Sequence, residues 1–197
     1  MIAYIDGKLT HKDPTYVIID VNGVGYQIKI SLSTYSSLPS GERCKLHTYL
    51  HIKEDAHTLY GFTTAAEKDV FLHLISISGV GPNTGLMILS SLSVEEVQQA
   101  IVREDVRTIQ HVKGIGAKTA QRIILELKDK MKKEVMATDA VVVPATAYNT
   151  VRSEALSALV TLGFAKNVAE KTLDNIIKRE GREMSVEELI KFALKSS

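Results

Sequence analysis

Two stretches of the chain, "SISGVGPNTGLMILSSLS" at residues 76–93 and "HVKGIGAKTAQRIILELK" at residues 111–128, carry the same short pattern. They share a Gly-x-Gly, a Thr, an Ile and a Leu at one constant offset, the 35 residues that separate Gly79 from Gly114. Glycines placed between two apolar helical patterns predict a tight turn. The sequence therefore predicts one helix–turn–helix unit built twice.

The predicted turns have the chemistry of an anion-binding site. A glycine turn leaves the N–H groups of the turn and of the next helix's first residues without helical partners. It also lets a ligand approach where no Cβ stands in the way, and we expect positive φ at Gly79, Gly81, Gly114 and Gly116. A phosphate there meets several donors and the positive end of a helix dipole, a contact that depends on backbone charge rather than base identity.

Duplication strengthens this interpretation. One Gly-x-Gly is most often only a tight connection, whereas two copies can pack about a pseudo-twofold axis like that of duplex nucleic acid. In the second copy Lys118 and Arg122 stand on one helical face, where cations directed at phosphate belong. The predicted DNA-binding residues are Gly79, Val80, Gly81, Asn83 and Thr84 in the first copy, and Gly114, Ile115, Gly116, Lys118, Thr119 and Arg122 in the second.

Composition indicates a globular protein without strong bulk charge. The 197 residues are 45% hydrophobic with a net charge of +1, and no apolar run approaches the roughly 18 residues that span a bilayer. The N-terminus lacks the features of a signal peptide, and the single Cys44 is expected to be a small core residue in the reducing cytosol. We therefore expect a cytoplasmic protein whose anion binding comes from local placement of charges and amides.

Residues 1–63 have the pattern of a small β-barrel. Asn22-Gly23 predicts a type I′ hairpin turn, and residues 43–52 alternate between apolar and polar side chains as a half-buried strand does. The two strands of this hairpin, residues 43–52 and the short segments "MIAYIDG" and "HTLYGF" give about five strands, the number in an OB-fold.

Residues 64–136 have helical periodicity and are expected to form five helices. Thr64 with Glu67, and Ser93 with Glu96, have the spacing of capping boxes at helix starts. Residues 137–149 suit a linker, with an edge strand at "AVVVPA" as the alternative. Residues 150–197 predict three short helices.

The predicted fold class is therefore a multidomain α+β protein. It has an N-terminal OB-fold β-barrel, a central all-α domain that resembles tandem helix-hairpin-helix domains, and a C-terminal three-helix bundle that resembles ubiquitin-associated (UBA-like) domains.

The repeated pattern resembles the helix-hairpin-helix motif of DNA-binding proteins that do not recognise sequence. The likeness extends along the chain, because "VNGVGYQI", "KEDAHTLYGF", "GVGP", "GIGAKTA" and "ALVTLGF" follow the order seen in the RuvA family. That resemblance implies a subunit of the RuvAB branch-migration complex that binds four-way junction DNA in homologous recombination and DNA repair, including the SOS response. Asn83 and Ala117 stand where relatives often carry lysine.

The resemblance also implies partners. The C-terminal domain would contact the RuvB ATPase, with Leu162, Gly163 and Phe164 as the partner-binding residues, although these apolar residues can equally form the bundle's core. The RuvC resolvase is a further implied partner. The expected assembly is a homotetramer with one subunit per junction arm, and whether four or eight subunits assemble on DNA stays open.

Glu54 and Asp55 lie between two predicted strands, where a solvated turn is the ordinary interpretation. The resemblance instead matches them to the acidic pin at the centre of a RuvA tetramer. Four such pairs would repel phosphates near the axis, which would disfavour continuous duplex and guide separated strands into neighbouring arms.

Catalytic and metal-binding motifs are missing from the sequence. No Walker A motif, nucleophile elbow or acidic cluster for divalent metals is present, and His47 and His51 lie too far apart on a strand for one tetrahedral site. We expect no catalytic residue, metal or cofactor. The alternatives are a structure-specific nuclease subunit and a protein-binding scaffold that does not hold DNA.

Overall fold

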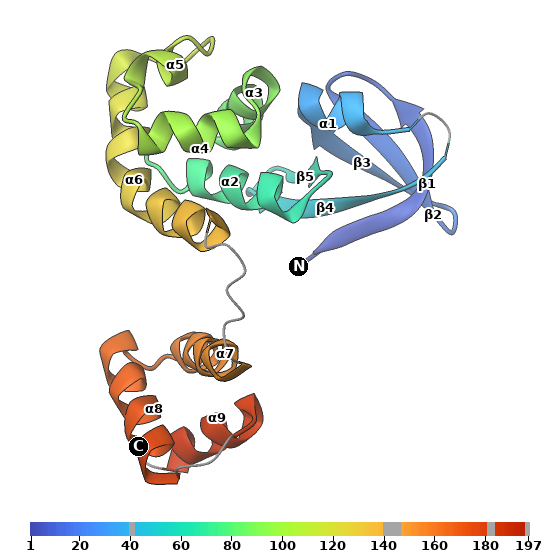
Figure 1. Cartoon of the computed structure of the whole chain (residues 1–197). Coiled ribbons are helices and arrows are strands. Elements are labelled where there is room, and N and C mark those ends of the chain that lie inside the picture. Colours follow the sequence, from blue (N-terminus) through green and yellow to red (C-terminus); the bar gives the residue numbers. More distant parts are fainter. Residues whose placement is uncertain (40–41, 140–146, 181–183, 196–197) are drawn as a thin grey trace. The chain divides into compact units, whose positions relative to one another are not determined.

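The computed structural model describes residues 1–39, 42–139, 147–180 and 184–195, and Figure 1 shows its elements. The chain forms two compact units, Met1–Thr138 and Asp139–Ser197. The first contains a β-barrel and the helices that carry the repeated turns, and the second is a helical bundle.

The barrel is closed by five strands in the order β1-β2-β3-β5-β4. Only β3 and β5 pair in parallel, and the other neighbours are antiparallel. This is the OB-fold predicted from the sequence. The strands are β1 Tyr4–Lys12, β2 Tyr16–Val21, β3 Val24–Ile30, β4 Arg43–Ile52 and β5 His57–Phe62.

Local sequence explains the barrel's turns and inner face. Asn22 and Gly23 have φ of 52° and 89°, as a type I′ turn requires. Alternation along β4 buries Cys44 and Leu46 in the barrel core, and burial raises the pKa of the Cys44 thiol. Cys44 is thus the core residue that the sequence predicted.

A short helix, α1 Leu32–Ser37, follows β3 and was not predicted. Its sequence is rich in hydroxyl side chains and has no apolar stripe, so periodicity gave no signal. The helix forms because the Ser31 side chain caps its first turn.

Five helices complete the first unit, as predicted: α2 Ala65–Ile75, α3 Pro82–Ser91, α4 Val94–Val102, α5 Val106–Gln110 and α6 Ala117–Asp139. Ser93 and Glu96 form the full capping box at the start of α4. At α2 only half of the predicted box exists, because Thr64 Oγ1 accepts from the Glu67 N–H while the Glu67 carboxylate turns elsewhere.

The carboxylate of Glu67 is buried and joins α2 to the barrel. Its oxygens accept hydrogen bonds from the Ser31 hydroxyl at 2.8 Å, the Thr34 hydroxyl at 3.0 Å and the Thr63 N–H at 3.1 Å. The side chain is 5% exposed, so these donors replace the water that a buried carboxylate loses.

Strand β5 belongs to two hydrophobic cores. Leu59 lies in the barrel core, whereas Tyr60 and Phe62 lie in the core that α2–α6 share. The barrel and the helices that carry the turns are therefore packed directly on one another through this strand.

The second unit contains three helices, α7 Ala147–Thr161, α8 Lys166–Glu180 and α9 Val186–Lys195, around a core of its own. Gly163, with φ of 97°, ends α7, where the Phe164 N–H donates to the Leu159 carbonyl at 3.1 Å. This is a Schellman-type helix end. The predicted linker is helical at both ends, since α6 reaches Asp139 and α7 begins at Ala147. Its remaining residues 140–146, with the alternative edge strand, lie outside the described residues.

Candidate nucleic-acid interface

The two repeated turns have the same backbone conformation. Gly79 and Gly114 have φ of 93° and 88°, a left-handed region that favours glycine. The second glycine of each pair differs from the prediction. Gly81 is extended, with φ of −85°, and caps α3, and Gly116 also lacks a positive φ. Positive φ is needed only where the chain reverses, and the second glycine already leads into the helix.

Apolar residues anchor both turns in one core. Ile77 and Val80 of the first copy, and Val112 and Ile115 of the second, are buried in the same cluster. The Val80 N–H donates to the Ile77 carbonyl at 3.0 Å, and the Ile115 N–H donates to the Val112 carbonyl at 3.1 Å. This corrects the expectation that every turn residue offers a free amide, because Val80 and Ile115 hold the turns in place.

The remaining amides of the turns have no acceptor within the described part of the chain. They include those of Gly79, Gly81, Asn83 and Thr84 in the first copy and of Gly114, Gly116, Lys118 and Thr119 in the second. All four glycines are exposed, and nothing lies within 4 Å of the position that a Cβ would occupy on any of them. Each copy thus presents free donors to open space at the start of a helix, which is what a phosphate needs.

Arg122 connects the second copy to the first turn. Its Nη1 donates to the Ser78 carbonyl at 3.0 Å, and its Nε lies 3.7 Å from Glu126 Oε1. This hydrogen bond places the start of α6 beside the first turn. The guanidinium of Arg122 is therefore already engaged, whereas Lys118 is exposed and has no ion-pair partner among the described residues. Of the two predicted cations, Lys118 is the freer.

The Asn83 side chain in the first copy makes one hydrogen bond within the described residues. The Tyr60 hydroxyl lies 3.4 Å from Asn83 Oδ1, a weak hydrogen bond. Burial, with a smaller effect of Tyr49, raises the pKa of the Tyr60 phenol. Tyr60 therefore stays neutral and contributes no charge beside the first turn, a neighbour that sequence periodicity could not have identified.

The predicted acidic pair lies on the barrel, apart from the helices that carry the turns. Glu54 and Asp55 form the exposed turn between β4 and β5, which the Lys53 N–H closes by donating to the Ala56 carbonyl at 2.9 Å. In the ranges that the structure describes, neither carboxylate has an ion pair. Their charge is thus directed to solvent.

The predicted partner-binding residues divide between surface and core. Leu162 is 59% exposed, whereas Phe164 is half-buried against the core of the second unit. Sequence patterns could not tell which apolar residues stay outside. The structure adds Val160 and Val168, 42% and 54% exposed, on either side of the same α7–α8 turn.

The described residues contain neither a candidate metal site nor a candidate membrane span. No group of three His, Cys, Asp or Glu side chains there is placed to hold a metal ion. None of the described helices combines the length and apolar character that crossing a bilayer requires.

Comparison with protein families matches three consecutive segments. The RuvA N-terminal domain matches residues 1–61, the SAM-like helix-hairpin-helix tandem matches residues 71–129, and the RuvA C-terminal domain matches residues 150–197.

Similar full-length proteins carry one shared name, Holliday junction branch migration complex subunit RuvA. The protein from Cytophaga hutchinsonii is 60% identical and the match covers 100% of both chains. Those from Christiangramia forsetii and Bacteroides fragilis are 53% and 46% identical, and each match covers 99% of both chains.

Proposed function

The chain belongs to the RuvA family of Holliday junction branch migration complex subunits, and from this premise we propose that its two glycine turns hold the sugar–phosphate backbones of a four-way junction. It is a DNA-binding subunit of the RuvAB complex and not an enzyme, since the ATPase of that complex is RuvB. Binding is structure-specific. It is also independent of sequence, because the free groups of the turns are amides and cations rather than base-reading side chains.

One observation carries this proposal. The turns at Gly79 and Gly114 have matching backbones on one shared core, and both present unpaired N–H groups to open space. Two phosphate-binding points fixed in one rigid unit suit a duplex arm, whose two backbones run at a regular separation. Lys118 adds charge at the second point.

The acidic pair supplies selectivity for the junction. Glu54 and Asp55 project from the barrel as an exposed turn, and in a homotetramer four such turns would gather at the axis. Their repulsion of phosphate would disfavour a continuous duplex at the centre and favour a junction whose strands separate there. We propose that one subunit of the homotetramer serves each arm of the junction.

The second unit is the proposed binding domain for the RuvB ATPase. Leu162, with Val160 and Val168 beside it, offers an apolar surface for RuvB, while Gly163 and Phe164 shape the turn that presents it. The RuvC resolvase would act on the same junction, and the complex would work in the cytoplasm. The proposed division is residues 1–63 for the barrel, 64–136 for DNA binding, 137–149 as linker and 150–197 for RuvB.

A competition experiment tests the function. A labelled four-way junction and a linear duplex of the same sequences are compared as ligands over a range of salt concentrations. We expect preference for the junction and a fall in log K of about 0.9 per neutralised phosphate for each unit of log salt. Equal affinity for both DNAs, or a flat salt response, would contradict the proposal. Cleavage of the junction on addition of magnesium would favour a nuclease instead.

A further inference from the structure

The two copies of the repeated unit differ in charge at equivalent positions. An offset of 35 residues pairs Lys118 with Asn83 and Arg122 with Met87. Both cations of the second copy are thus replaced by neutral side chains in the first. Arg122 reaches the first turn, but its guanidinium is engaged by the Ser78 carbonyl and by Glu126. If both turns hold phosphate, as proposed above, the first copy needs a free positive charge from elsewhere.

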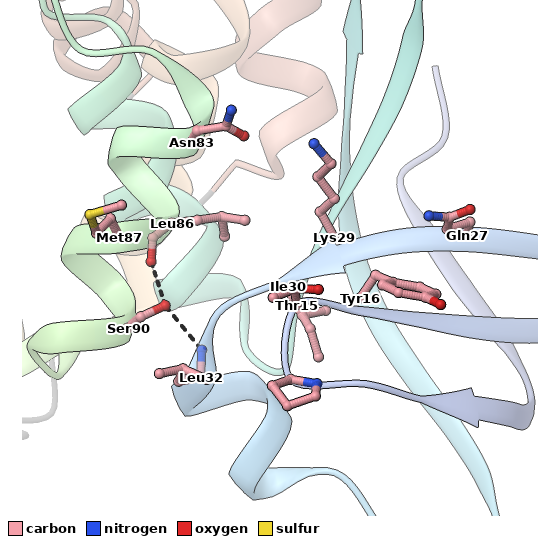
Figure 2. Close-up of a pocket in the computed structure, with 11 residues that line it drawn as sticks. Thr15, Tyr16, Gln27, Lys29, Ile30, Leu32, Asn83, Leu86, Met87 and Ser90 are labelled. Atoms are coloured by element: carbon pink, nitrogen blue, oxygen red, sulfur yellow. Dashed lines mark hydrogen bonds between the residues drawn. The ribbon is translucent and has the colours of Figure 1, made fainter.

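Asn83 and Met87 share a cavity with the barrel. It has a volume of about 480 Å³ and lies between α3 and strands β2 and β3. Figure 2 shows that Lys29 reaches into it from β3, with its amino group at the same end of the cavity as the Asn83 amide and away from Leu32. Lys29 is the only charged residue among the described residues that line this cavity.

Strand register explains why Lys29 faces the first copy. In the parallel pair of β3 and β5, Ile28 lies opposite Leu59, and Lys29 lies opposite Tyr60. Ile28 and Leu59 point into the barrel core, so alternation points Lys29 and Tyr60 outward. Tyr60 packs in the helical core and its hydroxyl reaches Asn83. Lys29 therefore lies beside Tyr60, whose hydroxyl reaches Asn83 at the start of α3.

The wall between barrel and α3 is fixed by hydrogen bonds. The Leu32 N–H donates to Ser90 Oγ at 3.0 Å, as Figure 2 shows, and the Ser33 hydroxyl donates to the Leu89 carbonyl at 2.7 Å. These hydrogen bonds join the segment that follows β3 to α3, and so they fix the position of Lys29 relative to the first turn. Its side chain is exposed, and within the described ranges it makes neither an ion pair nor a hydrogen bond.

We propose that Lys29 is a DNA-contacting residue that provides the first copy's phosphate-directed cation from the barrel, in the role that Lys118 has in the second copy. The phosphate would lie between the free amides at the start of α3 and the Lys29 amino group. This inference rests on the proposed function, since it assumes that the first turn holds a backbone.

The test is the junction affinity of Lys29→Gln, measured by fluorescence anisotropy over a range of salt concentrations. Each lost phosphate contact should weaken binding about eightfold at 0.1 M salt and lower the salt slope by about 0.9. Lys29→Arg should keep the affinity and the slope. Adding Asn83→Lys to Lys29→Gln should restore both, because it puts the charge where the second copy carries it.

Two further variants separate this inference from the proposed function. Lys8→Gln removes a lysine from the same barrel at a different cavity and should change affinity less than twofold. Lys118→Gln should weaken binding as Lys29→Gln does. If Lys118→Gln weakens binding while Lys29→Gln behaves like Lys8→Gln, the role of Lys29 is overturned and the proposed function stands. If no variant weakens binding, both are overturned. Failure of Asn83→Lys to restore affinity would overturn the equivalence of Lys29 and Lys118.

Discussion

Gly114 and Gly116 have different tasks although they stand two residues apart. Gly114 has a positive φ, so its lack of a side chain is needed for folding. Gly116 has no such requirement, and the space around it is empty. Its lack of a side chain matters only if something else occupies that space.

Substituting each glycine with alanine should separate these tasks. Gly114→Ala should lower the free energy of unfolding by about 1–2 kcal/mol, because a Cβ is strained in the left-handed region. Gly116→Ala should change it by less than about 0.5 kcal/mol, yet weaken junction binding because a methyl group stands where the phosphate approaches. Urea denaturation and junction titration measure the two effects. Junction affinity unchanged in Gly116→Ala would argue against a close approach of DNA.

Among elements, α2 depends on a contact that lies outside its own sequence. Its Glu67 has the spacing of a capping box, but its carboxylate binds donors from the barrel side instead. The cap could be predicted from local sequence, whereas the buried network could not, since Ser31 and Thr34 come from a distant segment.

Removing this carboxylate should loosen the barrel from the helices. Glu67→Ala removes the acceptor shared by the hydroxyls of Ser31 and Thr34 and the N–H of Thr63, and leaves the two hydroxyls only the hydrogen bond between them, which should cost about 3 kcal/mol. Glu67→Gln keeps the size and one acceptor and should cost less. Glu95→Ala, in the exposed first turn of α4, should cost less than about 1 kcal/mol. Equal losses in thermal unfolding for Glu67→Ala and Glu95→Ala would show that the network adds no stability.

The negative charge of the β4–β5 turn should determine the preference for a four-way junction over linear duplex DNA. Glu54→Gln with Asp55→Asn removes two exposed negative charges without altering the Lys53–Ala56 hydrogen bond that closes the turn. Binding to linear duplex should strengthen more than binding to the junction, because repulsion at the centre is relieved. Competition gel shifts at fixed salt measure the ratio. A ratio equal to that of the unaltered protein would exclude the pin role.

At the scale of the whole molecule, the chain consists of two units with separate cores. Removing residues 139–197 should therefore leave the first unit folded and able to bind a junction with unchanged affinity. Stimulation of RuvB ATPase activity should be lost with the second unit. Loss of junction binding in this truncated chain would contradict the division of labour.

Much of this architecture could be predicted because each element carries its own signal. The Asn22-Gly23 turn, the alternation in β4 and the apolar stripes of the helices are local patterns. What escaped prediction depends on contacts between distant segments, such as helix α1, the Glu67 network and the Arg122–Ser78 hydrogen bond. In the candidate site, the turns could be found from their repeat. Which of their amides are free, and where Lys29 lies, required the fold.

Because Ile77, Val80, Val112 and Ile115 share one core, no hinge separates the two points that would touch the DNA. If both turns contact DNA as proposed, they would engage and release an arm together. During branch migration the duplex would then rotate and advance across a stationary protein surface. Successive phosphates would bind the amides of the same two turns. This movement is fastest when the contacts do not depend on sequence, since DNA would pause wherever a preferred base pair bound more tightly.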